Sequence, residues 1–278
     1  MDTGRNIGFI GAGNMAEALI NGFISSGLVS PGRIFASDKV KERLLWLAER
    51  YEITVYNKNY EVAANSDIIF LTIKPQDVEA ALKDIAELMD ETKLIVSVMA
   101  GKTIDTLHSI LERSGVGTHP PIIRAMPNTP ALIREGAIGL YAEGRVKEED
   151  VTLVKRLFGS VGVVVELEEE GLLNTVTALS GSGPAYVFLL IEALIEAGIR
   201  GGLTPDDART LAVQTVAGAG RLLKKTDSSP EELIKRVASP GGTTIAGLSV
   251  LEKAGFKDII LKTVEAAKRR AEELAEED

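Results

Sequence analysis

Short apolar runs alternate with longer segments of helical spacing through the first 165 residues of the chain. Such runs are typical of strands buried on both faces, and apolar residues at i, i+3 and i+4 are typical of helices with one buried side. Strands are expected over residues 6–10, 33–37, 53–56, 68–73, 94–98, 122–126, 137–141 and 162–165. Helices are expected after the first strand and over residues 41–50, 78–89, 103–111 and 148–159. The alternation predicts an α/β fold with a doubly wound parallel sheet, of the Rossmann kind, covered by helices on both faces.

The pattern changes after about residue 166, where β-branched runs give way to segments rich in Ala, Leu, Glu and Lys that favour helices. Helices are expected over residues 169–179, 184–198, 205–224, 230–238, 243–253 and 256–276. We therefore predict two domains: a dinucleotide-binding domain at residues 1–165 and an all-helical domain at residues 166–278. Residues 187–197 are apolar on nearly every side, and we expect a partner chain to bury them.

Composition excludes several classes of function. The net charge of −9 disfavours nucleic-acid binding. The chain has no cysteine and only 2 histidines, so neither a disulfide nor a metal site is expected. The apolar stretch at residues 185–195 contains Glu192 and ends at Glu196, well short of the roughly 20 residues that a bilayer requires. No membrane segment and no signal peptide are predicted, and the expected location is the cytoplasm.

The first expected strand runs directly into a glycine-rich turn. Gly11, Gly13 and Ala16 fit the pattern G-x-G-x-x-G/A, in which the first glycine permits the turn and the second lets a pyrophosphate approach the backbone. The N–H groups at the start of the following helix then face an anion. The turn predicts a dinucleotide site that uses Gly11, Gly13, Asn14 and Met15, with a purely structural turn as the alternative.

The end of the second strand bears on which dinucleotide binds. Asp38 lies about 20 residues past the glycines, where an acidic side chain accepts from the ribose 2′-hydroxyl of NAD. Ser37 can instead donate to a 2′-phosphate, and Lys39, Lys41 and Arg43 add three cations nearby. The same cations would also suit an ordinary solvated helix face. We favour NADPH, with NADH as the alternative.

Four further segments, in this order, resemble the pyrroline-5-carboxylate reductases. They are Lys74-Pro75, Ala125-Met126-Pro127-Asn128-Thr129-Pro130, the segment 179–185 and Ser239-Pro240-Gly241-Gly242-Thr243-Thr244. The resemblance covers essentially the whole chain, and the last segment is its most specific part. It implies an oxidoreductase acting on a C=N group, which passes a hydride from NAD(P)H to 1-pyrroline-5-carboxylate and forms L-proline in the last step of proline biosynthesis. This chemistry requires positioning of two reactants more than a basic side chain.

The resemblance also implies a substrate loop. The loop maps onto Ser239, Gly241, Gly242, Thr243 and Thr244, and N–H groups at a helix start there suit a carboxylate. Thr244 matches the threonine whose hydroxyl binds the substrate ring nitrogen, and it is the expected catalytic residue. An ordinary N-cap of the helix at Ile245 is the alternative role for Thr244.

On the cofactor side, the resemblance implies contacts from residues at the strand ends. The expected residues, beyond those of the turn and the second strand, are Asn59, Thr72, Lys74, Pro75, Ala100, Met126, Pro127 and Asn128. For Lys74, exposure to solvent without a ligand is the alternative. For residues 180–184, which the family would place facing the active site, the alternative is a simple helix break.

The implied assembly is a homodimer formed through the helical domain, with a ring of dimers as a further option. Two related reductases compete with this interpretation. A β-hydroxyacid dehydrogenase would carry a lysine soon after a glycine turn, which residues 184–190 do not contain, and a deazaflavin-linked NADP reductase need not carry residues 166–278. A cofactor-binding sensor would need the glycine-rich turn but not the loop at residues 239–244.

Overall fold

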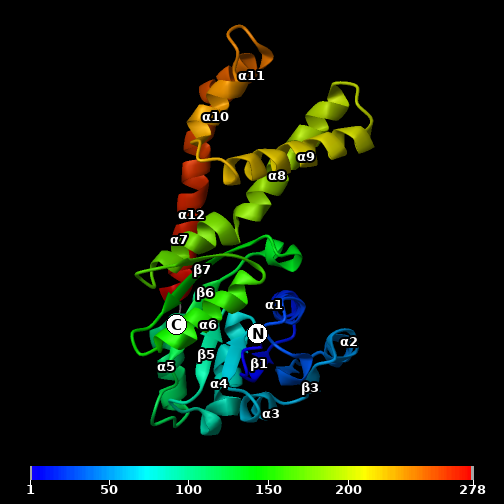
Figure 1. Ribbon diagram of the computed structural model, residues 1–278. Coiled ribbons are helices and arrows are strands. Elements are labelled where there is room, and N and C mark those ends of the chain that lie inside the picture. Colours follow the sequence, from blue (N-terminus) through cyan, green and yellow to red (C-terminus); the bar gives the residue numbers. More distant parts are fainter. Residues whose placement is uncertain (1, 277–278) are drawn as a thin grey trace. The chain divides into compact units, whose positions relative to one another are not determined.

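The structure, a computed structural model, describes residues 2–276 (Figure 1). The chain forms two compact units: Met1–Ser182 together with Ala267–Asp278, and Gly183–Ala266. This division lies further along the chain than the domain boundary expected after residue 165. The difference has a local cause, because α7 (Leu172–Val176) contacts strands β6 (Ile122–Met126) and β7 (Gly136–Ala142) of the first unit.

The first unit is built on a sheet with the strand order β3-β2-β1-β4-β5-β6-β7-β8. The remaining strands are β1 (Ile7–Ile10), β2 (Ile34–Ser37), β3 (Thr54–Tyr56), β4 (Ile68–Leu71), β5 (Leu94–Ser97) and β8 (Gly162–Glu166). Neighbouring strands are parallel, with Ile7 of β1 opposite both Ile34 and Ile68, except that β6 and β7 run antiparallel. The expected parallel sheet is therefore confirmed at every pair except this one. Residues 127–135 between them are fewer than the dozen or more that a parallel crossover needs.

Two hydrophobic layers cover the two faces of this sheet, and β4 shows how one strand serves both. Ile68 and Phe70 belong to one layer while Ile69 and Leu71 belong to the other, and all four are fully buried. Successive side chains of a strand point to opposite faces, so a strand covered on both sides must be apolar at every position. Each such side chain contributes about 1.5–3 kcal/mol through burial.

Helices from different parts of the chain supply the two layers. The first layer takes residues from α1 (Asn14–Ser25), α2 (Lys41–Tyr51) and α6 (Glu148–Gly159). The second takes residues from α3 (Asn59–Ala64), α4 (Val78–Ile85) and α5 (Ile104–Arg113). The short helix α3 was not predicted, because its six residues are too few to show a period. Short turns of 3-10 helix complete the unit: η1 (Pro31–Arg33), η2 (Pro75–Asp77), η3 (Ala86–Leu88) and η4 (Thr129–Ile133).

The second unit is helical. It contains α8 (Gly183–Arg200), α9 (Pro205–Lys224), α10 (Pro230–Val237), α11 (Thr243–Lys253) and the first part of α12 (Phe256–Glu276). Helices α8 and α9 pack closely where a Cβ at Gly198 would lie 3.0 Å from the Cβ of Ala208. The rest of α8 lacks cover within the chain, since Phe188 is 63% and Leu189 66% exposed. An apolar helix left this open needs a partner surface in water.

The glycine-rich segment at residues 180–184 does not end the helix, contrary to the break considered above. Helix α7 passes through a π-helical turn, η5 (Thr177–Gly181), in which the Ser182 N–H donates to the Thr177 carbonyl at 2.8 Å, and α8 follows. The continuous helix Leu172–Arg200 is, by length and composition alone, long and apolar enough to cross a membrane. The apolar stretch was expected to be too short because the π turn was not foreseen.

Candidate functional site

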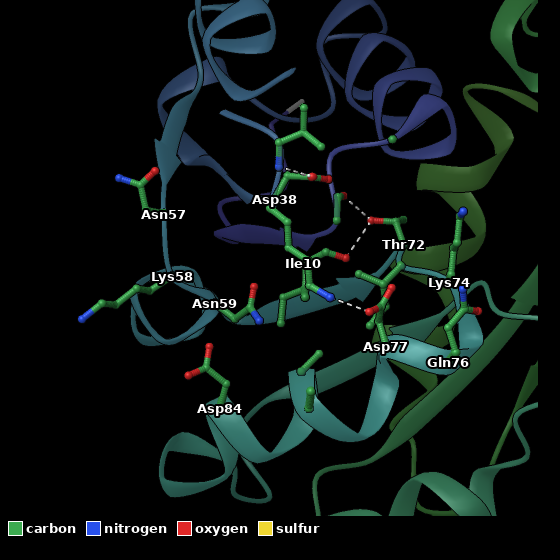
Figure 2. A pocket seen from close by; sticks show the side chains of 17 residues that line it. Ile10, Asp38, Asn57, Lys58, Asn59, Thr72, Lys74, Gln76, Asp77 and Asp84 are labelled. Atoms are coloured by element: carbon green, nitrogen blue, oxygen red, sulfur yellow. Dashed lines mark hydrogen bonds and ion pairs between the residues drawn. The ribbon is translucent and has the colours of Figure 1, made fainter. Parts of the chain in front are cut away.

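A cavity of about 670 Å³ lies at the carboxyl ends of β1, β2 and β4 (Figure 2). In the sheet, β1 lies between β2 and β4, so the strand order reverses here, which is where open α/β sheets bind ligands. The expected site residues that line the cavity are Gly11, Gly13, Asp38, Lys39, Asn59, Thr72 and Lys74. Residues that the sequence predicted to form one site, from four separate segments, therefore do line one cavity.

The two glycines of the turn differ in what they provide. Gly11 adopts a φ of +95°, and a Cβ there would lie 2.8 Å from the carbonyl carbon and oxygen of Thr72, so only glycine fits. Gly13 faces open space, with no atom within 4 Å of an added Cβ. The first glycine is thus required by the fold, whereas the second leaves room for a ligand.

Helix α1 begins at this open space with backbone donors to spare. Its first intrahelical bond runs from the Glu17 N–H to the Gly13 carbonyl at 3.0 Å. Among the described residues, the N–H groups of Gly13, Asn14 and Met15 have no backbone partner. Free donors at the positive end of the helix dipole, beside a glycine without steric neighbours, fit a pyrophosphate group.

Asp38 lines the cavity and also holds the glycine turn in place. One carboxylate oxygen accepts from the Ala12 N–H at 2.6 Å and the other from the Val40 N–H at 2.9 Å. Asp38 thereby fixes the glycine turn to the end of β2, and each of its oxygens already holds a strong donor. The two bonds fix the orientation of the carboxylate at the cavity wall, and each oxygen keeps a further acceptor site.

Helix α2 supports the same turn from outside. Arg43 donates from Nε to the Ala12 carbonyl at 2.7 Å and pairs with Glu17 of α1. The Arg43 guanidinium lies 4.6 Å from the ring centre of Trp46, and that of Arg50 lies 5.3 Å from it. These contacts are within the range of cation–π attraction. Arg43 therefore stabilises the turn and is not a free cation for a phosphate.

The adenosine end of the cavity contains cations that the sequence only partly indicated. Ser37 is buried, and its hydroxyl donates to Asn59 Oδ1 at 2.8 Å, so its one proton is already committed. Lys39 is exposed and pairs with Asp77 of η2. Lys58, which sequence reasoning missed, also lines the cavity. Its position directly after β3, the strand beside β2, was the only available signal.

The remaining cofactor candidates include residues that adjoin the cavity, such as Asn14 and Met15, and residues that are engaged elsewhere. Thr72 lines the cavity, but its hydroxyl contacts the Gly11 carbonyl at 2.6 Å and supports the turn. The expected residues that do not line the cavity are Asn14, Met15, Ser37, Pro75, Ala100, Met126, Pro127 and Asn128. Asn128 is almost buried, donating to the Ser180 carbonyl and accepting from the Ala137 N–H, both at 2.9 Å. The Asn128 side chain thus links the π turn η5 to strand β7.

The expected substrate loop lies in the second unit, between α10 and α11. Gly241 has a φ of +73°, and a Cβ at Gly242 would lie 2.5 Å from the Ser239 hydroxyl oxygen, so both positions require glycine. Gly242 is the N-cap of α11 and supplies no side-chain cap. The first backbone bond runs from the Ala246 N–H to the Gly242 carbonyl, which leaves the N–H groups of Thr243 and Thr244 free among the described residues.

This geometry tests the N-cap role considered for Thr244. Thr244 lies inside the first turn of α11 and is not its N-cap. Its hydroxyl makes no hydrogen bond with the described residues. The N-cap alternative was therefore wrong, and the first turn of α11 offers both free N–H groups and a hydroxyl. No group of three or more His, Asp or Glu side chains suited to a metal ion occurs among residues 2–276.

Two family models match separate parts of the chain. Residues 170–274 match the family model described as pyrroline-5-carboxylate reductase dimerisation. Residues 6–101 match the model described as NADP oxidoreductase, coenzyme F420-dependent. The first match covers the part of the chain that was expected to discriminate between the rival reductases.

Relatives extend the similarity to the whole chain. The pyrroline-5-carboxylate reductase of Pseudomonas aeruginosa is 40% identical over 277 residues, which is 100% of this chain and 99% of that protein. The structure of the Coxiella burnetii pyrroline-5-carboxylate reductase matches with a TM-score of 0.90 and 36% identity, covering 98% of both chains. That of the Plasmodium falciparum pyrroline carboxylate reductase with NADP bound matches with a TM-score of 0.87 and 32% identity, covering 99% of this chain and 100% of the other. The chain belongs to the pyrroline-5-carboxylate reductase family.

Proposed function

We propose that this chain reduces 1-pyrroline-5-carboxylate to L-proline with NADPH, and that NADH serves as a second hydride donor. The observation that carries the proposal is that one chain places free helix-start N–H groups both beside the dinucleotide cavity and in the expected substrate loop. One helix start lies at Gly13 beside the dinucleotide cavity, and the other follows Gly242 in the substrate loop. Each offers free N–H groups to an anion, as a pyrophosphate and a substrate carboxylate require.

The reaction divides the work between cofactor and protein. The reduced nicotinamide, when bound, supplies the hydride to the C=N carbon, and the protonated ring nitrogen becomes the amine. The protein holds the pyrophosphate through the N–H groups of Gly13, Asn14 and Met15. The first turn of α11 binds the substrate carboxylate, and the Thr244 hydroxyl hydrogen-bonds the ring nitrogen and orients the ring. Ala100, Met126 and Pro127 border the nicotinamide in this proposal.

Selection of NADPH rests on the charges at the adenosine end. Asp38 is occupied by two backbone N–H groups, so it does not compete with a 2′-phosphate for the available donors. Lys58 lines the cavity, and so does Lys39, which would have to exchange its ion pair with Asp77 for the phosphate. We assign the 2′-phosphate to these two lysines, with Asn59 at the ribose.

The active form is a homodimer joined through the helical unit, and rings of such dimers are a further proposal. The exposed apolar residues of α8 support an interface, since a dimerisation model matches the segment that contains them. The same interface accounts for the membrane-like composition of the helix Leu172–Arg200. A cytoplasmic location is part of this proposal.

The test is a direct assay with both cofactors. Loss of nicotinamide absorbance is followed after 1-pyrroline-5-carboxylate is added to the purified protein with NADPH, and then with NADH, and proline is identified as the product. We expect turnover with both and a higher kcat/KM for NADPH. A protein that binds NADPH but reduces the substrate with neither cofactor would contradict the proposal. In that case proline should also leave the Tm of the NADP-bound protein unchanged, as a cofactor sensor would.

A further inference from the structure

An ion pair between buried Arg124 and partly buried Glu170 joins three segments beside the expected nicotinamide half of the site. Arg124 of β6 is 5% exposed, and its Nη1 donates to Glu170 Oε1 at 2.8 Å. Its Nη2 donates to the Met99 carbonyl, just after β5, at 3.3 Å. The same Glu170 oxygen accepts from the N–H of Ile104, the first residue of α5, at 2.8 Å. The pair thus connects the end of β5, the start of α5 and the segment that leads into α7.

Stability alone is a weak reason for this arrangement. Buried ion pairs lose as much through desolvation as they gain through attraction, and apolar residues of similar volume often replace them without loss. Moreover, the Nε of Arg124 is buried without a hydrogen-bond partner among the described residues, which adds an uncompensated donor. Because the Arg124–Glu170 pair adds little net stability, we looked for backbone groups whose position it fixes.

The geometry that the pair controls is the turn after β5. The peptide group is planar, so an Arg124 guanidinium that holds the Met99 carbonyl also fixes the direction of the Ala100 N–H. Gly101 follows with a φ of +75°, and a Cβ there would lie 3.1 Å from both the Cβ and the carbonyl oxygen of Leu274. Arg124 and Leu274 therefore contact the turn at residues 99–101, and Glu170 holds Arg124 and the start of α5 beside it.

This turn lies on the side of the sheet where a dinucleotide places its reactive ring. Asp38 and Asn59 belong to the β2 and β3 side of the cavity, while β5 lies beyond β4 on the other side of β1. A dinucleotide that spans the reversal point with its adenosine near Asp38 extends its nicotinamide toward β4 and β5. Ala100 then borders the ring from the turn that Arg124 holds.

We propose that Arg124 and Glu170 are positioning residues for hydride transfer, which hold the turn at residues 99–101 against the nicotinamide without touching either reactant. The inference rests on the proposed function. Displacements of about 1 Å cost roughly 100-fold in rate when two reacting atoms must meet. Loosening this turn should therefore slow the chemical step and leave binding of the phosphates and adenosine at Gly13 and Lys58 intact.

The test compares Arg124→Met, Arg124→Lys and Glu170→Gln with the parent chain. We expect Arg124→Met to lower kcat about 10- to 100-fold, with the Kd for NADPH within about twofold of the parent value. The isotope effect on kcat with NADPH deuterated at the transferred position should rise, since hydride transfer becomes more rate-limiting. Glu170→Gln keeps the shape and an acceptor for the Ile104 N–H and should lose less, and Arg124→Lys should recover part of kcat.

The matched control is Arg5→Met. Arg5 pairs with nearly buried Asp150 at 3.1 Å, in the same unit but at the opposite, amino end of the strands. This variant should keep kcat and the isotope effect. A folded Arg124→Met protein with the same kcat as the control would overturn the inference. So would a loss of kcat that is explained entirely by a smaller fraction of protein able to bind NADPH. If Arg124→Met does not fold, Glu170→Gln decides by the same two readouts. Absence of turnover in the parent chain would instead refute the proposed function.

Discussion

The side-chain amide of Asn128 donates to the Ser180 carbonyl at 2.9 Å, at the point where a proline leaves that carbonyl without its helical partner. In an α-helix the Ser180 carbonyl would accept from the N–H of residue 184, but Pro184 has none. The Asn128 side chain supplies the missing donor, and its oxygen accepts from the Ala137 N–H of β7. The helix can therefore continue through a π turn where the sequence favours a break.

Removing this amide should destabilise the first unit. Asn128→Leu removes the hydrogen-bond partner of both the Ser180 carbonyl and the Ala137 N–H, and we expect a loss of about 1–2 kcal/mol in the free energy of unfolding. Urea denaturation measures it. Asn65→Ala, which removes an exposed amide bonded to the Glu61 carbonyl, is the control and should cost less than about 1 kcal/mol. Equal losses in the two variants would contradict this account.

The two glycines of the turn should respond differently to a methyl group. Gly13→Ala meets no atom within 4 Å, so we expect a Tm close to that of the parent chain and a Kd for NADPH raised about tenfold or more, because the methyl occupies phosphate space. Calorimetric titration measures the Kd. Gly11→Ala should lower the Tm, since its Cβ overlaps Thr72. Gly32→Ala, at another open glycine far from the turn, should change neither quantity.

Cofactor preference should depend on lysines and not on Ser37. Lys39→Ala and Lys58→Ala each remove a charge near the 2′-phosphate, and we expect the Kd for NADPH to rise about 5- to 20-fold with that for NADH nearly unchanged. Ser37→Ala should affect both cofactors alike, because its hydroxyl is bonded to Asn59. Lys83→Ala, at an exposed lysine of α4, serves as the control. If Lys58→Ala weakened the binding of both cofactors equally, Lys58 would not be the residue that binds the 2′-phosphate.

The role of the Thr244 hydroxyl can be separated from helix stability. Thr244→Val keeps the shape of the side chain, and we expect kcat/KM to fall roughly 10- to 1000-fold with an unchanged Kd for NADPH. Thr244→Ser should retain most of the activity. Because Gly242 and not Thr244 caps α11, circular dichroism should show the same melting curve for all three proteins. Thr263→Val on α12 is the control, and a Thr244→Val protein as active as this control would exclude a catalytic role.

Charge on the exposed face of α8 should separate the subunits. Leu189→Glu places a carboxylate on a side chain that is 66% exposed in the single chain and that we assign to the dimer interface. We expect light scattering to report the monomer mass at micromolar concentration, since a buried unpaired charge is strongly unfavourable in an interface. Leu45→Glu on α2, at an equally exposed leucine of the first unit, should keep the parent mass. Dissociation of both variants into monomers would contradict the assignment of the dimer interface to α8.

The strands were predictable because the sheet is covered on both sides. Ile68 to Leu71 must all be apolar, and such a run is visible without any knowledge of its neighbours. The direction of β7 was not predictable from the same signal, because an apolar run reads equally in either direction. Only the short connection at residues 127–135 contained that information, through the length that a parallel crossover requires.

The site was predictable where local backbone chemistry defines it. Gly11, Gly13 and Gly242 are needed for turns and close approaches, and their spacing alone indicates these features. The roles of Asp38 and Asn128 were not predictable, because their hydrogen-bond partners come from other segments of the chain. Lys58 was missed for the related reason that its importance follows from β3 lying next to β2, and adjacency in the sheet is not written in the residues themselves.

The contact between Trp46 and Arg43 makes the glycine turn observable by spectroscopy. The chain has a single tryptophan, so its intrinsic emission arises from one known place on α2. One guanidinium separates the indole ring from the Ala12 carbonyl, because Arg43 contacts both. We expect phosphate binding at the turn to shift Arg43 relative to the indole and so to change the colour and intensity of its emission. The protein thus carries a built-in optical reporter of its own cofactor site, with no label attached.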